Sequence, residues 1–164
     1  MSAKLCILPV FLCCCSVASV STEANFNLLK TLQGSWKIEV EGKPLAIEMT
    51  YDLGSKQSIV TERFGKELSV FYRNGQRVEM VHFCNAGNQP RLRLKDPSEP
   101  GVLDFEMFAI TNLITPETSH VQEVIYKILD ANTVKLEIVW WPKAKGSEKY
   151  TLDRIRETRS ASPQ

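Results

Sequence analysis

The feature that most constrains the fold of this chain is an alternation of apolar and charged side chains with a period of two residues. Trp36, Ile38 and Val40 alternate with Lys37 and Glu39. Because successive side chains of a β-strand point to opposite faces, this pattern predicts strands with one buried and one hydrated face. We expect about ten such strands, at about residues 35–41, 45–53, 58–64, 67–73, 77–84, 91–95, 102–109, 120–129, 133–141 and 148–156.

The connections between these strands are short and rich in turn-forming residues. Asn74-Gly75 predicts a tight hairpin of type I′, in which both central residues adopt positive φ. No amphipathic helix separates the strands, which excludes parallel βαβ folds. An antiparallel up-and-down meander removes its edges by closing on itself. The predicted fold class is therefore all-β, an antiparallel up-and-down β-barrel of about ten strands, preceded by one short helical turn at residues 26–33.

The N-terminal segment has the composition of a targeting sequence. Lys4 precedes an uncharged apolar run from Leu5 to Val20, and small residues follow. This pattern predicts a signal peptide at residues 1–21, cleaved between residues 18 and 24, and hence secretion. The apolar run of about 16 residues is shorter than the roughly 20 that a membrane span needs. Anchoring through an uncleaved signal or a lipidated Cys15 is the alternative.

The remaining chain has the composition of one globular domain, with 43% hydrophobic residues. We assign the domain to residues 25–156 and a disordered polar tail to residues 157–164. Four of the five cysteines lie in the predicted signal peptide, so only Cys84 is left and no intramolecular disulfide can form. The packed core or closure of the sheet must therefore hold the fold.

The charge balance excludes one class of partner. Twenty basic and 19 acidic residues give a net charge of +1, whereas a nucleic-acid surface needs an excess of Lys and Arg on one face. We expect no nucleic acid and no stable membrane span after signal removal. The oligomeric state is left open.

Charged residues also assign the two faces of each strand. Arg77 and Glu79 are expected to face water, which places His82 and Cys84 inside the barrel. The same argument, made from Glu123, places His120 inside. Neighbouring Glu62 and Arg63 cannot both face out, so one of them is expected inside with a polar partner.

Two parts of the sequence resemble known proteins. A short helical turn, Gly34-Ser35-Trp36 at the start of the first strand and Leu152-Asp153-Arg154 in the last resemble the lipocalin and fatty-acid-binding superfamily, the calycins. The string HFCNAGNQPR at residues 82–91, with Thr111-Asn112 and His120 downstream, resembles a lipocalin-like family of unknown function found largely in bacteria. The resemblance covers about residues 26–156. It implies a barrel, with Trp36 and Arg154 packed together as barrel-closing structural residues.

The chain direction then predicts where a site would form. If the first strand leaves the closed end at Trp36, the loops at 42–44, 65–66, 85–90, 110–119 and 142–147 all lie at the opposite, open end. Ligand sites form at the mouths of barrels. The residues that we expect to bind a ligand there are His82, Cys84, Asn88, Gln89, Arg91, Asn112 and His120.

The function predicted from the sequence is a secreted, non-enzymatic lipocalin-like barrel that binds a small amphiphilic molecule at its mouth. No catalytic residue, metal ligand or cofactor is assigned. One alternative is a haem-binding, metal-binding or catalytic barrel that uses His82, Cys84 and His120. Another is a shut barrel that acts on another protein through Trp141. The filling of the interior decides between a ligand cavity and a shut barrel, and it depends on Met49, Tyr51, Met80, Phe105, Met107 and Tyr126.

Overall fold

The computed structural model describes residues 20–96, 99–142 and 146–155. Most of the predicted signal peptide (residues 1–19) and the predicted tail (157–164) lie outside the described residues. Within the described ranges, no helix has both the length and the apolar character of a membrane span.

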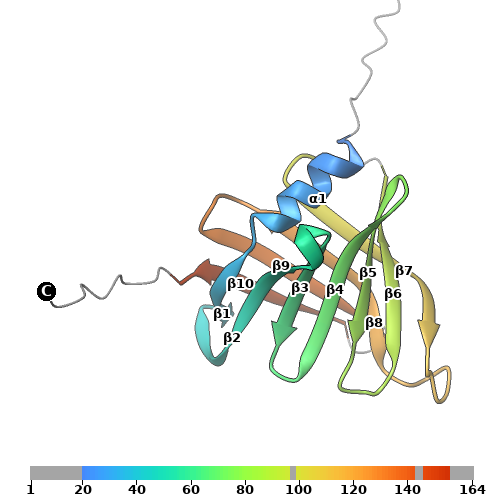
Figure 1. The fold of residues 1–164 in the computed structure, drawn as a ribbon. Helices are drawn as coiled ribbons and strands as arrows, with labels where there is room; N and C mark the ends of the chain where they lie inside the picture. The colour runs from blue at the N-terminus through green and yellow to red at the C-terminus, as the bar shows by residue number, and fades with distance from the viewer. Residues whose placement is uncertain (1–19, 97–98, 143–145, 156–164) are drawn as a thin grey trace, which may run out of the picture.

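Ten antiparallel strands form one closed barrel, which confirms the predicted fold class (Figure 1). Each strand pairs with its neighbours in the sequence, and the last strand pairs with the first, so the sheet has no free ends. The strands are β1 (Gly34–Val40), β2 (Lys43–Gly54), β3 (Ile59–Phe64), β4 (Glu67–Asn74), β5 (Arg77–Phe83), β6 (Gln89–Leu94), β7 (Val102–Thr111), β8 (His120–Ile128), β9 (Thr133–Trp141) and β10 (Ser147–Arg154); a 3-10 turn, η1 (Ser55–Gln57), links β2 to β3.

A single α-helix, α1 (Thr22–Lys30), lies across one end of the barrel (Figure 1). It begins earlier than the sequence pattern predicts because the Ser21 side chain caps it and accepts a hydrogen bond from the Ala24 N–H. Phe26 and Leu29 on its inner side are fully buried. The β1–β2, β3–β4 and β5–β6 turns lie at the end away from α1, which we call the open end.

Trp36 and Arg154 lie together at the end that α1 covers. They are direct partners in the β1–β10 register, and the guanidinium lies 4.4 Å from the centre of the indole ring. The indole N–H donates to the Leu32 carbonyl at 2.7 Å, and Arg154 donates to the carbonyls of Gln33, at 2.6 Å, and Thr31. The pair therefore ties the end of α1 to the first and last strands.

Large side chains fill the barrel. Phe71 makes edge-to-face contacts with Phe105 and Tyr126, at ring distances of 5.6 and 6.0 Å. Six residues are expected to decide whether the interior is filled. Met107 is partly buried, and the other five are at most 1% exposed: Met49, Tyr51, Met80, Phe105 and Tyr126. A ligand inside the barrel is therefore restricted to a site near one of its ends.

The β4–β5 turn differs from the prediction. Asn74 pairs with Arg77 as the last residue of its strand, so Gly75 and Gln76 form the loop. Only Gly75 has positive φ, at 59°, and the type I′ assignment is therefore wrong. A glycine at the first loop position is instead typical of a type II′ turn.

Glu79 is on the outer face of β5, but the expectation that it faces water is wrong because its neighbours cover it. Only 4% of Glu79 is exposed. The Tyr72 hydroxyl and the Asn74 amide each donate to its carboxylate at 3.1 Å, and the Arg91 guanidinium lies 3.6 Å away. These contacts compensate the carboxylate for its lost water.

The β1–β2 hairpin extends beyond the rest of the wall at the open end. β2 starts at Lys43, but its pairing with β3 starts only at Met49. Leu45 and Ile47, in the extended part, are 38% and 44% exposed. This stretch of β2 therefore has one strand edge without a strand partner among the described residues.

Candidate functional site

A row of polar residues crosses the inner face of four neighbouring strands. Tyr51 of β2 pairs with Glu62 of β3, Glu62 pairs with Ser69 of β4, and Ser69 pairs with His82 of β5. Residues paired directly across an antiparallel sheet point to the same face. The register alone therefore brings these four side chains together inside the barrel. Of the neighbours Glu62 and Arg63, it is Glu62 that points inward, with 7% exposure.

The carboxylate of Glu62 is the centre of this row. The Tyr51 and Tyr126 hydroxyls donate to its Oε2 atom at 2.7 and 2.6 Å, and the Ser69 hydroxyl donates to Oε1 at 3.1 Å. Burial, and next the charge of Glu62, raise the pKa of both tyrosines well above the ordinary value, so both phenols stay protonated. Charge-assisted hydrogen bonds of this kind stabilise a carboxylate that burial would otherwise disfavour.

The hydrogen-bond chain fixes the tautomer of His82. Its Nδ1 atom lies 3.0 Å from the Ser69 hydroxyl, which has already donated its proton to Glu62. The hydroxyl oxygen must then accept from Nδ1–H, and the lone pair of the neutral ring is on Nε2. Burial lowers the pKa of His82, outweighing the opposing charges of Glu67 and Glu62, which keeps the ring neutral at pH 7. Nε2 is buried and has no hydrogen-bond partner within the part of the chain that the structure describes.

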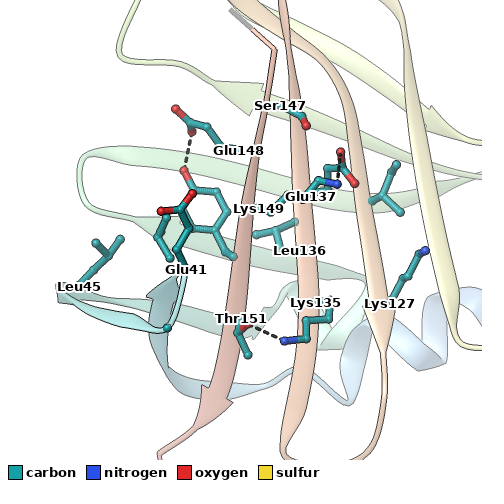
Figure 2. Close-up of a pocket in the computed structure, with 14 residues that line it drawn as sticks. Glu41, Leu45, Lys127, Lys135, Leu136, Glu137, Ser147, Glu148, Lys149 and Thr151 are labelled. Atoms are coloured by element: carbon teal, nitrogen blue, oxygen red, sulfur yellow. Dashed lines mark hydrogen bonds and ion pairs between the residues drawn. The ribbon is translucent and has the colours of Figure 1, made fainter.

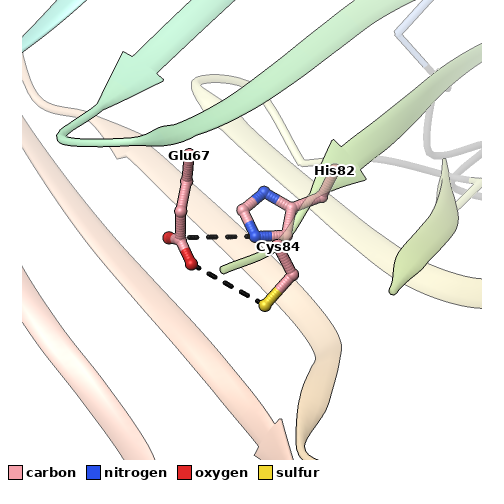
Figure 3. Close-up of side chains that lie close together, drawn as sticks. All are labelled: Glu67, His82 and Cys84. Atoms are coloured by element: carbon pink, nitrogen blue, oxygen red, sulfur yellow. Dashed lines mark hydrogen bonds and ion pairs between the residues drawn. The ribbon is translucent and has the colours of Figure 1, made fainter. Parts of the chain in front are cut away.

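Glu67 and Cys84 surround the Nε2 atom of His82 (Figure 3). Glu67 Oε2 lies 3.9 Å from Nε2, and Glu67 Oε1 lies 3.7 Å from the sulfur of Cys84. The three candidate ligand atoms all lie within 4.8 Å of one another. Cys84 comes so close because it lies in the turn after β5, where the chain leaves the strand geometry that separates alternate side chains.

A small cavity of about 20 Å³ lies next to this group. That volume holds about one water molecule. Its lining surface is mostly apolar, from Met49, Phe64, Val121, Val124 and Ile138, with polar groups from Glu62, Glu67, Ser69 and His82. The cavity is far too small for a haem, so the structure gives no support to the haem alternative.

His120 lies on the opposite face of the barrel wall from His82, so its predicted inward orientation is wrong. It pairs with Trp141, whereas its neighbour Val121 pairs with Trp140 and lines the inner cavity. A register shift between Val121 and Glu123 reverses the inward and outward positions at the start of β8. The imidazole of His120 packs against the indole of Trp141, with ring centres 6.4 Å apart. His120 is therefore absent from the group around His82.

Three of the predicted site residues join two loops at the open end. The Asn88 amide donates to the Ser119 carbonyl at 2.9 Å, the Asn112 amide donates to the Gly87 carbonyl at 2.5 Å, and the Gln89 side-chain oxygen accepts from the Thr111 hydroxyl at 3.0 Å. These contacts hold the turn after β5 against the loop between β7 and β8. Asn88 Oδ1 has no partner in the described part of the chain.

Arg91 is the last of the predicted site residues, and it lies on the outer face. Its guanidinium faces Glu79 and lies 5.1 Å from the centre of the Phe108 ring. Of the seven predicted ligand-binding residues, the structure thus brings His82 and Cys84 together inside. The ligand-binding role of all seven stays a prediction.

A larger groove of about 930 Å³ lies on the outer wall beside the β1–β2 hairpin (Figure 2). Lysines from β8, β9 and β10 line it, and two of them already have partners. Lys149 lies 3.6 Å from Glu137, and Lys135 donates to the Thr151 hydroxyl at 2.7 Å. None of the predicted site residues lines this groove. Its polar groups are largely satisfied, so the inner group around His82 makes the stronger candidate site.

The prediction from sequence missed Glu67, although the sequence contained a signal for it. Phe71 is an apolar residue that points inward, and Ser69 and Glu67 are two and four positions before it on the same strand face. Glu67 also follows directly after the Gly65-Lys66 turn at the open end. Alternation counted back from Phe71 would have placed Glu67 inside and next to the mouth.

No family model matches the sequence, and no curated protein matches it either. The functional argument therefore depends on the closed barrel and on the group of residues around His82.

Proposed function

We propose that the protein is a binding barrel that takes the polar end of a small amphiphilic molecule at its open end. The observation that carries this proposal is the Nε2 atom of His82, which is buried, has no hydrogen-bond partner among the described residues and faces the cavity beside Glu67. A buried polar atom without a partner costs about 1–3 kcal/mol. A ligand that supplies the missing donor recovers that cost.

The polar end of the ligand is expected to carry hydrogen-bond donors. Nε2 of His82 and the oxygens of Glu67 are all acceptors in the assigned protonation state. No Lys or Arg of the described segments lies within ion-pair distance of Glu62 or Glu67. A carboxylate or phosphate would meet uncompensated negative charge there, so a hydroxyl or an ammonium group fits best.

The filled interior limits how far the ligand enters. The cavity holds about one water molecule, so only the polar end reaches His82. Phe64 and Ile138 provide apolar contacts next to this position. The apolar part of the ligand then rests on these side chains and projects toward the open end.

We also propose that the protein acts after export. The single positive charge of Lys4 ahead of the apolar run from Leu5 to Val20 supports a signal peptide. Detection of the protein in the medium, and N-terminal sequencing of it, tests this proposal.

Titration with two amphiphiles of equal chain length tests the ligand proposal. Metal-free protein is titrated with n-octylamine and with octanoate while amide NMR signals are followed. We expect n-octylamine to shift the signals of Ser69, His82 and Phe64, and octanoate to leave them unchanged, because the site offers only acceptors. His82→Gln is expected to weaken n-octylamine binding by about tenfold, the effect of one lost hydrogen bond.

The control for this titration is His120→Gln, which changes the other histidine of the chain on the outer face. It is expected to bind n-octylamine like the unchanged protein. Shifts confined to the groove around Lys149, equal binding of both amphiphiles, or no binding of either would contradict the proposal.

One observation favours a second candidate function, in which the shut barrel pairs with a second copy. The part of β2 from Lys43 to Glu48 has an unpaired edge, and Ile47 on it is 44% exposed. Such edges pair readily with other strands. Sedimentation equilibrium is expected to give the mass of a dimer if this candidate holds, and Ile47→Lys to restore the monomer. A monomer at all concentrations tested would rule it out.

A further inference from the structure

We infer that Glu67, His82 and Cys84 bind a divalent transition-metal ion at the open end, with zinc the best fit. This inference rests on the proposed function, since it assigns a metal to the same site. The three residues come from two places in the sequence: Glu67 begins β4, and His82 and Cys84 lie at and just after the end of β5. Figure 3 shows the carboxylate, imidazole and thiol pointing toward one another.

The distances suit a small ion. The three ligand atoms lie within 4.8 Å of one another. In a tetrahedral zinc site with bonds of about 2.0–2.3 Å, neighbouring ligand atoms are about 3.3–3.8 Å apart. Rotation of the Glu67 and Cys84 side chains that moves their ligand atoms by up to about 1–1.5 Å closes this difference.

Each ligand is oriented by a further hydrogen bond, which is typical of metal sites. Nδ1–H of His82 donates to Ser69, which itself donates to Glu62, and Nε2 is left for the ion. The Ala86 N–H points at the sulfur of Cys84 at 3.4 Å, as donors do toward a thiolate. The Asn85 N–H donates to Oε1 of Glu67 at 3.0 Å, so Oε2 is left for the ion.

Charge and ligand type favour zinc over the hard cations. A thiolate and a carboxylate together carry two negative charges, which one divalent ion neutralises. Sulfur and imidazole ligands select zinc and copper, whereas calcium and magnesium prefer oxygen ligands. Binding releases the thiol proton to solvent, because the ligand is the thiolate.

Three protein ligands leave one coordination position open. Zinc sites with three protein ligands hold water or an exchangeable small molecule in the fourth position. Here that position faces the cavity beside Phe64 and Ile138. A hydroxyl at the polar end of an amphiphile would bind the ion there directly.

Cobalt(II) titration tests the site, because cobalt replaces zinc in such sites and is coloured. The full chain is used with Cys6, Cys13, Cys14 and Cys15 replaced by serine, so that Cys84 is the only thiol. We expect a thiolate-to-cobalt charge-transfer band in the near ultraviolet and strong visible bands typical of four-coordinate cobalt. Both should saturate at one ion per chain and disappear when zinc is added.

Variants then assign the ligands. Cys84→Ser is expected to remove the charge-transfer band, and His82→Gln and Glu67→Gln to weaken zinc binding by at least 100-fold in calorimetry. Ser69→Ala, which removes the hydroxyl that orients His82 and that donates to Glu62, should weaken it about 10–100-fold. His120→Gln and Glu79→Gln replace the same residue types on the outer face and should leave zinc binding unchanged.

The inference is overturned if cobalt gives no thiolate band with the unchanged Cys84, a result that does not depend on any variant folding. It is also overturned if the ligand variants bind zinc like the controls. If metal-free protein binds n-octylamine but the cobalt titration shows no metal site, the proposed function is supported and the metal inference is overturned. A zinc site without binding of any amphiphile would leave only the metal inference.

Discussion

Replacing Trp36 with alanine is expected to lower the free energy of unfolding by about 3–5 kcal/mol, the usual range for deleting a buried indole. Only 1% of Trp36 is exposed, and its ring packs edge-to-face on Tyr51 at 6.4 Å. The substitution also leaves the Leu32 carbonyl without its donor and the Arg154 guanidinium without the ring beneath it. The substitution removes the contacts of Trp36 with Leu32, Tyr51 and Arg154 at the same time, so the surrounding side chains cannot refill the space by partial collapse.

The measurement is urea unfolding followed by far-ultraviolet circular dichroism, because the substitution removes a fluorophore. The matched control is Trp141→Ala. Trp141 is 37% exposed on the outer face, where its indole donates to the Pro116 carbonyl at 3.0 Å. A single exposed hydrogen bond and partial packing predict a loss of about 1 kcal/mol. Equal losses for the two variants would contradict the assignment of Trp36 as the residue that closes the barrel.

Replacing Tyr126 with phenylalanine is expected to lower the free energy of unfolding by about 1.5–3 kcal/mol, although it deletes a single oxygen atom. The Tyr126 hydroxyl is one of the donors to the buried Glu62 carboxylate, at 2.6 Å. The phenyl ring keeps its contact with Phe71, so the packing is unchanged and the loss reports the hydrogen bond. Urea unfolding with an unchanged slope measures it.

The matched control is Tyr72→Phe. The Tyr72 hydroxyl also donates to a carboxylate, that of Glu79, at 3.1 Å, but without it Glu79 still has the Asn74 amide at 3.1 Å and the Arg91 guanidinium at 3.6 Å. We expect a loss of less than about 1 kcal/mol. In the double variant Tyr51→Phe/Tyr126→Phe, the loss should exceed the sum of the single losses, because the last donor to Oε2 of Glu62 is then gone. Additive losses would show that the two hydroxyls act independently.

The fold could be predicted largely from the sequence because local rules determine it. Alternation of side chains gives each strand, and short turns permit only antiparallel neighbours. Closure followed from the need to remove the edges of a meander. The β4–β5 turn was predicted at the right place with the wrong geometry, since Asn74-Gly75 and Gly75-Gln76 differ by one residue in the register of the pairing.

The orientation of His120 could not be predicted in the same way. Alternation assumes an uninterrupted strand, and the shift between Val121 and Glu123 reverses it. A bulge of this kind has no dependable sequence signal when glycine is absent. Counting from Glu123 places the His120 side chain inside, but His120 lies beyond the shift and its side chain is therefore on the outer face.

The polar network around Glu62 shows a different limit. Tyr51, Ser69 and His82 each follow inward alternation on their own strand, but alternation does not say which positions of different strands are level with one another. That depends on the register, which the turns and bulges set together. The alternation pattern predicted that one of Glu62 and Arg63 points inward but not which, and the register shows that it is Glu62, beside the hydroxyl donors of Tyr51 and Ser69.

The pairing of β1 with β10 also has a consequence for how the chain is made. All the other pairings join strands that are consecutive in the sequence, so these hairpins can form as the chain is synthesised. The pairing of β1 with β10, which joins Trp36–Glu39 to Thr151–Arg154, can form only after β10 has been synthesised. Until then β1 and β9 both present open edges, which are the sites where strands of different molecules associate. The final strand thus determines whether the newly made chain becomes one barrel or a template for aggregation.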